Sequence, residues 1–301
     1  MEKDLQGKVF VVTGANSGIG FVAALDFARR GATVVIMCRN ESRGNEAVET
    51  IRRESGNEDV HLYLADFSLM SNVAEAGRKV LADYPRIDVL CNNAGAANAQ
   101  RQETAEGFEL TFAANHLGGF LLTQLLLPAL LNAASEDSAR VVFTSSLGHK
   151  SGPLDFDDLN MSRGYRGLKA YGHSKLMNLL TARELFYRYG EQGIISSSFH
   201  PGAVRTPIWS KGGVAGNLLG IVLYPFMVNM EKGADTMIWL ASSSDPAAVH
   251  AEGNYHFKRE RPPIAHFATD KVAKKLWEVS MELVEPYLDN PAGKKLIESL
   301  S

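Results

Sequence analysis

Residues 8–20 read KVFVVTGANSGIG and join a short apolar run to a turn that is rich in glycine. The run over residues 8–12 is nearly continuous and rich in β-branched side chains, which predicts a buried strand. A helical pattern over residues 21–30 follows the turn. Strand, glycine turn and helix in this order predict a site for a pyrophosphate, because glycine lets the backbone come close and the helix start offers unpaired N–H groups. The spacing, Gly-x-x-x-Gly-x-Gly, differs from the more common Gly-x-Gly-x-x-Gly.

Apolar runs and helical patterns alternate along the rest of the chain, which predicts an α/β fold with a single doubly wound domain. Further strands are predicted over residues 33–37, 60–64, 89–91, 140–144, 194–200 and 253–255. Further helices are predicted over residues 41–55, 108–131, 171–189, 233–243 and 270–287. The last of these helices is amphipathic and is expected to cover the core or a partner subunit.

The residues after the second predicted strand indicate which dinucleotide binds. NAD-dependent folds commonly place an acidic residue about 20 residues past the glycines, where it holds the ribose 2′-hydroxyl. This chain has Cys38 there, followed by Arg39, with Arg43 close behind. A guanidinium without a carboxylate suits a 2′-phosphate, so NADP(H) is the predicted cofactor. An arginine that merely caps a solvated loop is the alternative interpretation.

Polar residues also follow the later strands. Asp66 comes after the third strand and could accept a hydrogen bond from an adenine amino group, cap a helix, or do both. The small segment 92–95 closes the fourth strand, where its asparagines are expected to pin neighbouring backbone. Ser145 and Ser146 follow the fifth strand, at the edge where ligands bind in open α/β sheets.

The predicted helix 171–189 begins with Tyr171 and Lys175, which lie four residues apart and share one helix face. A phenol titrates near ~10, too high for proton transfer at neutral pH, and a nearby ammonium is expected to lower that pKa. Tyr171 could then exchange a proton with a carbonyl or alcohol oxygen. Asn115 is a further candidate, because it lies beside two glycines in a long apolar helix. The neighbouring His116 is interpreted as a core histidine.

The composition excludes some classes of function. Of the 301 residues 45% are hydrophobic and 22% are charged, and the formal net charge of -3 gives no reason to expect nucleic acid as a partner. Cys38 and Cys91 lie in apolar runs and are expected to stay reduced. No apolar run is expected to reach the ~18–20 residues of a spanning helix, and no secretory signal is found, so a cytoplasmic protein is expected. No metal site is predicted.

The motifs together resemble the short-chain dehydrogenase/reductase family over residues 8–255. Thr-Gly-x-x-x-Gly-Ile-Gly, Asn-Asn-Ala-Gly, Ser-Ser, Tyr-x-x-x-Lys and Pro-Gly-x-Val-x-Thr occur in the order of that family. Cys-Arg-Asn, Asn-His-Leu-Gly, Ser-Ser-Leu-Gly-His and Tyr-Gly-His-Ser-Lys are most similar to its retinol dehydrogenase-like and WW-domain-oxidoreductase-like members. The resemblance implies a seven-stranded Rossmann sheet and a catalytic set of Asn115, Ser146, Tyr171 and Lys175, with Ser145 as the alternative serine.

The resemblance also implies roles for these residues. Ser146 would bind the substrate oxygen, and Tyr171 would protonate it. Lys175 would lower the pKa of Tyr171 and bind the nicotinamide ribose, while Asn115 would hold a water that links Lys175 to solvent. The residues predicted to line the cofactor are Gly14, Asn16, Ser17, Gly18, Ile19, Gly20, Arg39, Asp66, Phe67, Asn93, Ala94, Gly95, Tyr171, Lys175, Pro201, Gly202, Val204 and Thr206.

The predicted activity is reversible hydride transfer between NADP(H) and a small hydrophobic alcohol, ketone or aldehyde. One domain over residues 1–301 is expected, with a cofactor half over 1–145 and a catalytic and substrate half over 146–260. Residues 207–231 are apolar and predict a lid over the substrate, with a core helix, a subunit contact and shallow membrane contact as alternatives. A nucleotide-binding sensor without turnover and an epimerase or dehydratase of the same fold stay open, as do monomer and homodimer.

Overall fold

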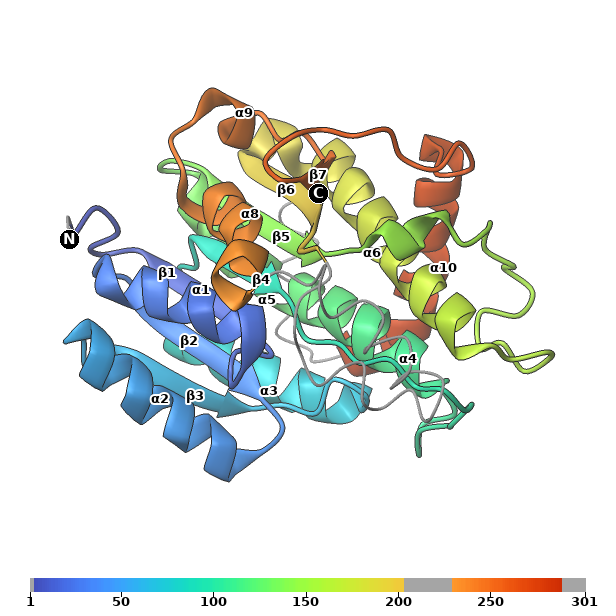
Figure 1. Cartoon of the computed structure of the whole chain (residues 1–301), viewed down its shortest axis with the longest axis horizontal. Coiled ribbons are helices and arrows are strands. Elements are labelled where there is room, and N and C mark those ends of the chain that lie inside the picture. The colour runs from blue at the N-terminus through green and yellow to red at the C-terminus, as the bar shows by residue number, and fades with distance from the viewer. Residues whose placement is uncertain (1–2, 203–228, 289–301) are drawn as a thin grey trace.

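The computed structural model describes residues 3–202 and 229–288. A single parallel sheet runs through it in the order β3-β2-β1-β4-β5-β6-β7, with helices on both faces (Figure 1). The strands are β1 Val9–Thr13, β2 Thr33–Cys38, β3 Val60–Leu64, β4 Val89–Asn92, β5 Ala139–Thr144, β6 Ile194–His200 and β7 Tyr255–Phe257. The strand order reverses between β1 and β4, and in such sheets ligands bind outside the carboxyl ends of these two strands. The predicted doubly wound α/β fold is confirmed.

The helices form two layers. On one face α1 packs against α2 and α8, and on the other α3 packs against α5, with α10 lying over α6, α5 and α3. The principal helices are α1 Gly18–Arg29, α2 Glu41–Ser55, α3 Met70–Asp83, α4 Leu110–Phe112, α5 Gly118–Ala134, α6 Gly167–Tyr189, α8 Met230–Ser242, α9 Pro246–Val249 and α10 Asp270–Leu288. Shorter turns are the π-helix η1 Ala113–Leu117 and the 3-10 helices η2 Leu147–Lys150 and η3 Gly190–Gln192.

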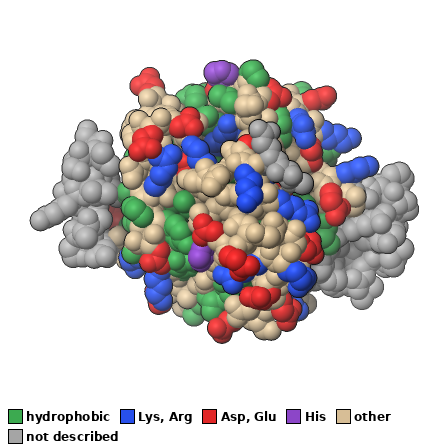
Figure 2. Space-filling model, turned by 90° about the vertical axis from the view of Figure 1, so that its left-hand side faces the viewer, with side chains coloured by type: hydrophobic (Ala, Val, Ile, Leu, Met, Phe, Trp, Pro, Cys, Tyr) green, Lys and Arg blue, Asp and Glu red, His purple; other side chains and the backbone are tan. Residues whose placement is uncertain are grey.

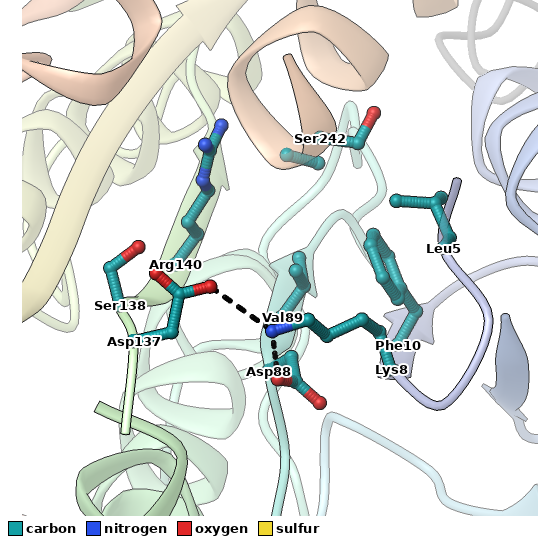
Figure 3. Close-up of a pocket in the computed structure, with 10 residues that line it drawn as sticks. Leu5, Lys8, Phe10, Asp88, Val89, Asp137, Ser138, Arg140 and Ser242 are labelled. Atoms are coloured by element: carbon teal, nitrogen blue, oxygen red, sulfur yellow. Dashed lines mark hydrogen bonds and ion pairs between the residues drawn. The ribbon is translucent and has the colours of Figure 1, made fainter. Parts of the chain in front are cut away.

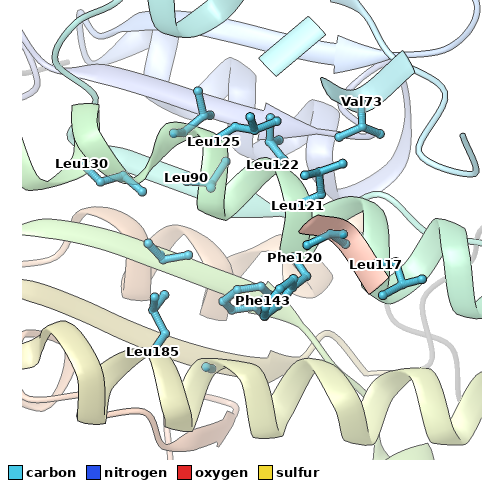
Figure 4. Packing of buried hydrophobic residues seen from close by; sticks show 14 of the residues in the cluster. Val73, Leu90, Leu117, Phe120, Leu121, Leu122, Leu125, Leu130, Phe143 and Leu185 are labelled. Atoms are coloured by element: carbon cyan, nitrogen blue, oxygen red, sulfur yellow. The ribbon is translucent and has the colours of Figure 1, made fainter. Parts of the chain in front are cut away.

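Each strand supplies side chains to both layers, because successive residues of a strand point to opposite faces of the sheet. In β1, Phe10 and Val12 pack with the α1 layer, while Val11 packs with the α5 layer. Figure 4 shows the second of these cores, where Leu90 of β4 and Phe120 of α5 belong to one cluster. Fully burying each such side chain contributes ~1.5–3 kcal/mol, so the two cores fix the position of every strand end.

Most predicted elements are found close to their predicted bounds. The helix 41–55 and the strands 60–64 and 194–200 are confirmed residue for residue. The last strand was predicted over 253–255 and instead spans Tyr255–Phe257. The shift arises because Gly253 has a φ of 71°, and a Cβ there would lie 2.8 Å from the Cα of Arg183. Residues 253 and 254 therefore form the turn that enters the strand.

The longest apolar helix is continuous from Leu110 to Ala134 through α4, η1 and α5. It begins two residues later than predicted, because the Glu109 carboxylate accepts hydrogen bonds from the backbone N–H groups of Thr111 (2.9 Å) and Phe112 (2.7 Å). By length and composition this helix could cross a membrane, with a mean hydropathy of 1.6, which corrects the expectation that no segment would pass that test. Within the fold 78% of that apolar window is buried, as in the core helix of a globular protein.

The predicted lid, residues 207–231, lies outside the described residues except for its last three. Of these, Asn229 caps α8 by accepting a hydrogen bond from the Lys232 N–H (2.9 Å), and Met230 begins the helix. The helix predicted over 233–243 therefore starts three residues earlier.

The amino ends of the strands carry paired charges. Lys8 Nζ lies 3.2 Å from Asp88 Oδ1 and 3.1 Å from Asp137 Oδ2, beside a cavity of about 140 Å³ (Figure 3). Arg140 lines the same cavity and donates to two backbone carbonyl groups at the end of α8, at 3.0 and 2.8 Å. On the face shown in Figure 2 basic and acidic side chains are interspersed. The cavity lies at the end of the sheet opposite to the predicted site, so the polar residues at the carboxyl ends are the candidates for function.

Candidate active site

The turn between β1 and α1 leaves the start of a helix without a side-chain cap. Ser17 is the N-cap residue of α1, but its side chain makes no capping hydrogen bond, and the first turn contains no acidic residue. In contrast, Asn40 caps α2 and Asn229 caps α8 through their side chains. Free N–H groups at the positive end of a helix dipole form a site for an anion such as a pyrophosphate.

Two glycines let this turn approach the end of β4. Gly14 has a φ of 65°, and a Cβ added there would lie 2.9 Å from the Cα of Ala94. At Gly20 an added Cβ would lie 2.6 Å from the Asn93 side-chain nitrogen and 2.8 Å from the Gly14 carbonyl oxygen. A larger residue at either position would force a backbone shift. The cradle therefore has the form that a bound dinucleotide requires.

Asn93 ties the ends of three strands together, as predicted for this segment. Its Nδ2 donates to the Thr13 carbonyl (3.0 Å), and its Oδ1 accepts from the Thr144 hydroxyl (3.2 Å). Thr13 Oγ1 in turn accepts from the N–H groups of Asn93 and Ala94, both at 2.9 Å. The sequence reasoning missed Thr13 and Thr144, although each is a hydroxyl residue that ends an apolar strand.

The residues after β2 match the predicted pattern of an absent carboxylate and an available guanidinium. Cys38 is buried, with 4% of its surface exposed. Arg39 and Arg43 are exposed, and neither forms an ion pair with another described residue. Both guanidinium groups are thus available to an anion at this corner of the sheet.

Asp66 does not cap α3, which corrects one of the two interpretations of that residue. Its Oδ1 accepts from the N–H (3.0 Å) and the hydroxyl (2.7 Å) of Ser68, so the carboxylate closes a turn. The start of α3 is held instead by Glu106, whose carboxylate accepts from the N–H groups of Met70 (2.5 Å) and Ser71 (2.9 Å). The adjacent Phe67 points into the core, with 6% exposed.

Tyr171 and Lys175 lie on α6 beside the end of β5. Lys175 is 3% exposed, and its Nζ lies 5.4 Å from the centroid of the Tyr171 ring and donates to the Thr144 carbonyl (3.1 Å). Ser145 is fully buried, and its hydroxyl donates to the Lys175 carbonyl (2.7 Å). Ser146 is partly exposed, and its Oγ accepts only a 3.2 Å bond from the Gly148 N–H among the described residues. Of the two serines, Ser146 therefore has the more accessible hydroxyl.

The electrostatics of the pair differ from the sequence expectation. Burial raises the pKa of Tyr171 above its ordinary value, and the nearby Ser146 side chain opposes this rise. Burial also lowers the pKa of Lys175 to about 8. Lys175 was expected to lower the pKa of Tyr171, whereas desolvation of the phenol is the largest influence on that pKa and raises it. Tyr171 is consequently a protonated phenol at neutral pH.

Asn115 lies in the π-helical turn η1, a feature that often marks functional positions in helices. Its Oδ1 accepts from the Ala96 N–H (2.7 Å), and its Nδ2 donates to the Ala96 carbonyl (2.8 Å) and to Ser174 Oγ (3.0 Å). Asn115 thus fixes the loop after β4 against α6. His116 is buried at 1% exposure with its Nε2 2.9 Å from Ser280 Oγ, which confirms the interpretation of a core histidine.

The predicted site residues that the structure describes converge at the carboxyl edge of the sheet. At Gly95 an added Cβ would lie 3.1 Å from Asn115 Oδ1 and 3.4 Å from Lys175 Nζ, so the cofactor loop and the catalytic candidates meet there. Pro201 and Gly202 follow β6 directly, and Gly202 has a φ of 85°. The predicted Val204 and Thr206 lie outside the described residues.

Comparison with known proteins places the chain among enzymes. Residues 8–213 match the family described as short chain dehydrogenase. A protein with the provisional name of daunorubicin C-13 ketoreductase, from Streptomyces sp. (strain C5), is 39% identical over 282 residues, covering 93% of each chain. Human retinol dehydrogenase 13 is 35% identical over 286 residues, covering 93% of this chain and 85% of its own.

Solved structures show the same architecture. An uncharacterized protein from Mycobacterium paratuberculosis has a TM-score of 0.73 and 30% identity, covering 95% of this chain and 97% of its own. A short chain dehydrogenase from Escherichia coli CFT073, complexed with NADPH, has a TM-score of 0.64 and 25% identity, covering 86% of this chain and all of its own.

Proposed function

The chain belongs to the short-chain dehydrogenase/reductase family, and on that premise we propose that it is an NADP(H)-dependent carbonyl reductase and alcohol dehydrogenase for a hydrophobic substrate. Membership of this family makes it an oxidoreductase that uses a nicotinamide cofactor. One observation carries the proposal: the buried ammonium of Lys175 lies over the ring of Tyr171, and the accessible Ser146 side chain lies within reach of the same phenol at the carboxyl edge of the sheet.

The proposed chemistry assigns a task to each of these groups. The nicotinamide, when bound, supplies or accepts the hydride. During reduction Ser146 Oγ donates a hydrogen bond to the substrate oxygen, and Tyr171 transfers its phenolic proton to that oxygen. Lys175 stabilises the phenolate that remains. Alcohol oxidation reverses these steps, with the Tyr171 phenolate as the base.

The proposed roles of the surrounding residues follow from their contacts. Asn115 acts as a positioning residue, because it holds Ala96 of the cofactor loop and Ser174 of the catalytic helix at once. The proposed water between Lys175 and solvent would add to this role. The start of α1 and its glycines bind the pyrophosphate, and the N–H and side chain of Asn93 hold the cradle in place.

Arg39 is proposed to bind the ribose 2′-phosphate, which favours NADP(H) over NAD(H). Its support is the exposed guanidinium beside the buried Cys38, at the place where NAD-binding folds carry a carboxylate. The NADPH complex of a structural relative is compatible with the same choice. The proposal places Asp66 near the adenine through the carboxylate oxygen that Ser68 does not use.

The proposed substrate is apolar, and two exposed leucines close in sequence to the catalytic candidates support this. Leu147 follows Ser146 directly and is 50% exposed, and Leu168, three residues before Tyr171, is 70% exposed. Covering exposed apolar side chains such as these with a ligand contributes ~25 cal/mol per Å² of buried surface. The names of the two relatives specify a ketone and an alcohol as substrates, in keeping with this chemistry.

The decisive experiment is turnover by the purified protein with a panel of ketones and aldehydes, followed by absorbance of the reduced cofactor. We expect NADPH to be consumed with higher kcat/KM than NADH. Tyr171→Phe should lose at least ~10²-fold in kcat while binding the cofactor nearly unchanged. Tyr187→Phe, an exposed tyrosine on the same helix, is the matched control. Normal turnover by Tyr171→Phe would refute the assignment, and cofactor binding without turnover of any carbonyl or alcohol would indicate a nucleotide sensor.

We propose a cytoplasmic enzyme, since the long apolar helix is packed inside the fold. Recovery of the active protein in the membrane fraction would contradict this location.

A further inference from the structure

Three buried polar side chains near Ser146 and Tyr171 have unused hydrogen-bonding atoms. His149, Tyr255 and His200 are 0%, 3% and 8% exposed. Within residues 3–202 and 229–288, His149 Nε2, the Tyr255 hydroxyl and His200 Nδ1 have no hydrogen-bond partner. Buried polar groups are nearly always paired in native proteins, directly or through water, so three unpaired atoms in one region require an explanation.

His149 holds Ser146 through its backbone and its ring. The Ser146 carbonyl accepts from the His149 N–H at 3.1 Å and lies 2.7 Å from His149 Nδ1. A carbonyl can only accept, so Nδ1 must carry a proton. Burial lowers the pKa of His149, which keeps the ring neutral. In a neutral ring with a proton on Nδ1, Nε2 is an acceptor, and it needs a donor.

Tyr255 is the neighbouring phenol that can supply this donor through a water. Its ring centroid lies 4.7 Å from that of His149, and its hydroxyl has no partner among the described residues. Burial raises the pKa of Tyr255, with a further contribution from Tyr171, so the phenol keeps its proton and lies within the electrostatic reach of the catalytic tyrosine. The register β6–β7, in which Ser198 is paired with Tyr255, fixes the Tyr255 backbone in the sheet.

We propose that His149 is a positioning residue for Ser146, kept in the tautomer with a proton on Nδ1 by one buried water that accepts a hydrogen bond from the Tyr255 hydroxyl and donates one to Nε2. This inference rests on the proposed role of Ser146. According to this proposal, Tyr255 on the edge strand β7 holds His149 on η2 in place. His149 in turn fixes the orientation of the Ser146 hydroxyl toward the substrate oxygen. A displacement of a catalytic group by about 1 Å is enough to lower turnover by ~10²-fold.

Substitution of His149 by asparagine or glutamine tests the contributions of its two ring nitrogens separately. The amide nitrogen of His149→Asn can occupy the place of Nδ1 and keep the bond to Ser146, but it has no atom at the place of Nε2. We expect His149→Ala to lower kcat by ~10-fold or more with an unchanged KM for the cofactor, and His149→Asn to recover most of that loss. His149→Gln, whose amide lies one bond further out, should recover less.

The contribution of Tyr255 is tested by a double-mutant cycle. Tyr255→Phe removes only the hydroxyl and should lower kcat a few-fold in the natural protein. In the His149→Asn background it should have no further effect, because the acceptor is already absent. Equal and independent losses in the two backgrounds would overturn the proposed bond.

Melting temperature and the parallel variant Ser146→Ala separate the remaining outcomes. If His149 serves only packing, His149→Ala and His149→Asn will lower the melting temperature alike and leave kcat per folded enzyme unchanged. That result would overturn this inference while leaving the proposed function intact. If Ser146→Ala itself retains full activity, the proposed function of Ser146 fails first.

Discussion

Lys175 should reduce the stability of this protein at neutral pH, and its removal should therefore stabilise the fold. The side chain is 3% exposed, and its Nζ donates to the Thr144 carbonyl without an ion pair to any described carboxylate. Burial lowers the pKa of Lys175 from 10.5 to about 8. The folded protein thus binds the proton of this lysine less tightly than the unfolded chain does.

The magnitude follows from the difference between the two pKa values. One unit corresponds to ~1.4 kcal/mol, so the shift corresponds to about 3 kcal/mol of unfavourable free energy below the folded-state pKa. Between about pH 8 and 10.5 the unfolded chain binds more protons than the folded protein, so the free energy of unfolding rises with pH in that window. Below about pH 8 the full penalty is present.

We expect Lys175→Met to be more stable than the natural protein by about 1–3 kcal/mol at pH 7. The estimate subtracts about 1 kcal/mol for the lost hydrogen bond to Thr144 from the burial penalty. Urea unfolding at pH 7, 8, 9 and 10, without nicotinamide cofactor, measures the difference. The advantage of the variant should shrink steadily above pH 8, while its activity is lost. Lys169→Met, an exposed lysine on the same helix, should show no such dependence on pH.

Two results would refute this reasoning. A difference in unfolding free energy that stays constant from pH 7 to pH 10 would mean that the lysine is not desolvated as described. A variant that is less stable than the natural protein at pH 7 would mean that the ammonium makes favourable contacts that outweigh its burial.

Three further predictions concern the reaction and the cofactor. Because burial raises the pKa of Tyr171, kcat for carbonyl reduction should change little between pH 6 and 8. The rate of alcohol oxidation should increase as the pH rises, and a decrease would contradict the assignment of Tyr171 as the base. Cys38→Asp with Arg39→Leu should shift the ratio of kcat/KM toward NADH, and an unchanged ratio would exclude Arg39 from the phosphate site. Gly20→Ala should weaken cofactor binding at least ~10-fold and lower stability by ~1–3 kcal/mol, measured by cofactor titration and urea unfolding; unchanged binding would place the pyrophosphate elsewhere.

Local patterns predicted the sheet and most helices, because these elements repeat over many residues. Helix 41–55 has Asn40 before it and Gly56 after it in a left-handed conformation, so its cap and its end are both encoded nearby. The apolar runs likewise predicted the strands that end just before Asn93 and Ser146. Once the order of strands was known, their side chains had to meet at one edge.

What the sequence did not reveal depends on distant partners. The start of α3 is held by Glu106, 36 residues away from Met70, whereas a local reading could offer only Asp66 as a possible cap. The direction of the Tyr171 pKa was mistaken for a similar reason. The spacing shows that a cation is near, but the burial that raises the pKa of Tyr171 is a property of the whole fold.

The π-helical turn at Asn115 explains why polar residues and glycines occur inside an apolar helix. The sequence has a polar pair followed by two glycines inside an apolar helix, and the structure resolves this by widening the helix at Ala113–Leu117. In a regular helical turn the Asn115 amide would face the apolar side chains of the core. The wider turn leads it instead to both backbone groups of Ala96.

The residues that deviate from ordinary helix and core chemistry lie together at one edge of the sheet. The uncapped start of α1 and the desolvated Lys175 each lower stability by themselves. The fold retains them because both cores hold the ends of β1, β4 and β5 in register, independently of these groups. Substitutions that relieve such features should therefore raise stability and remove activity together, which is the relation that Lys175→Met tests.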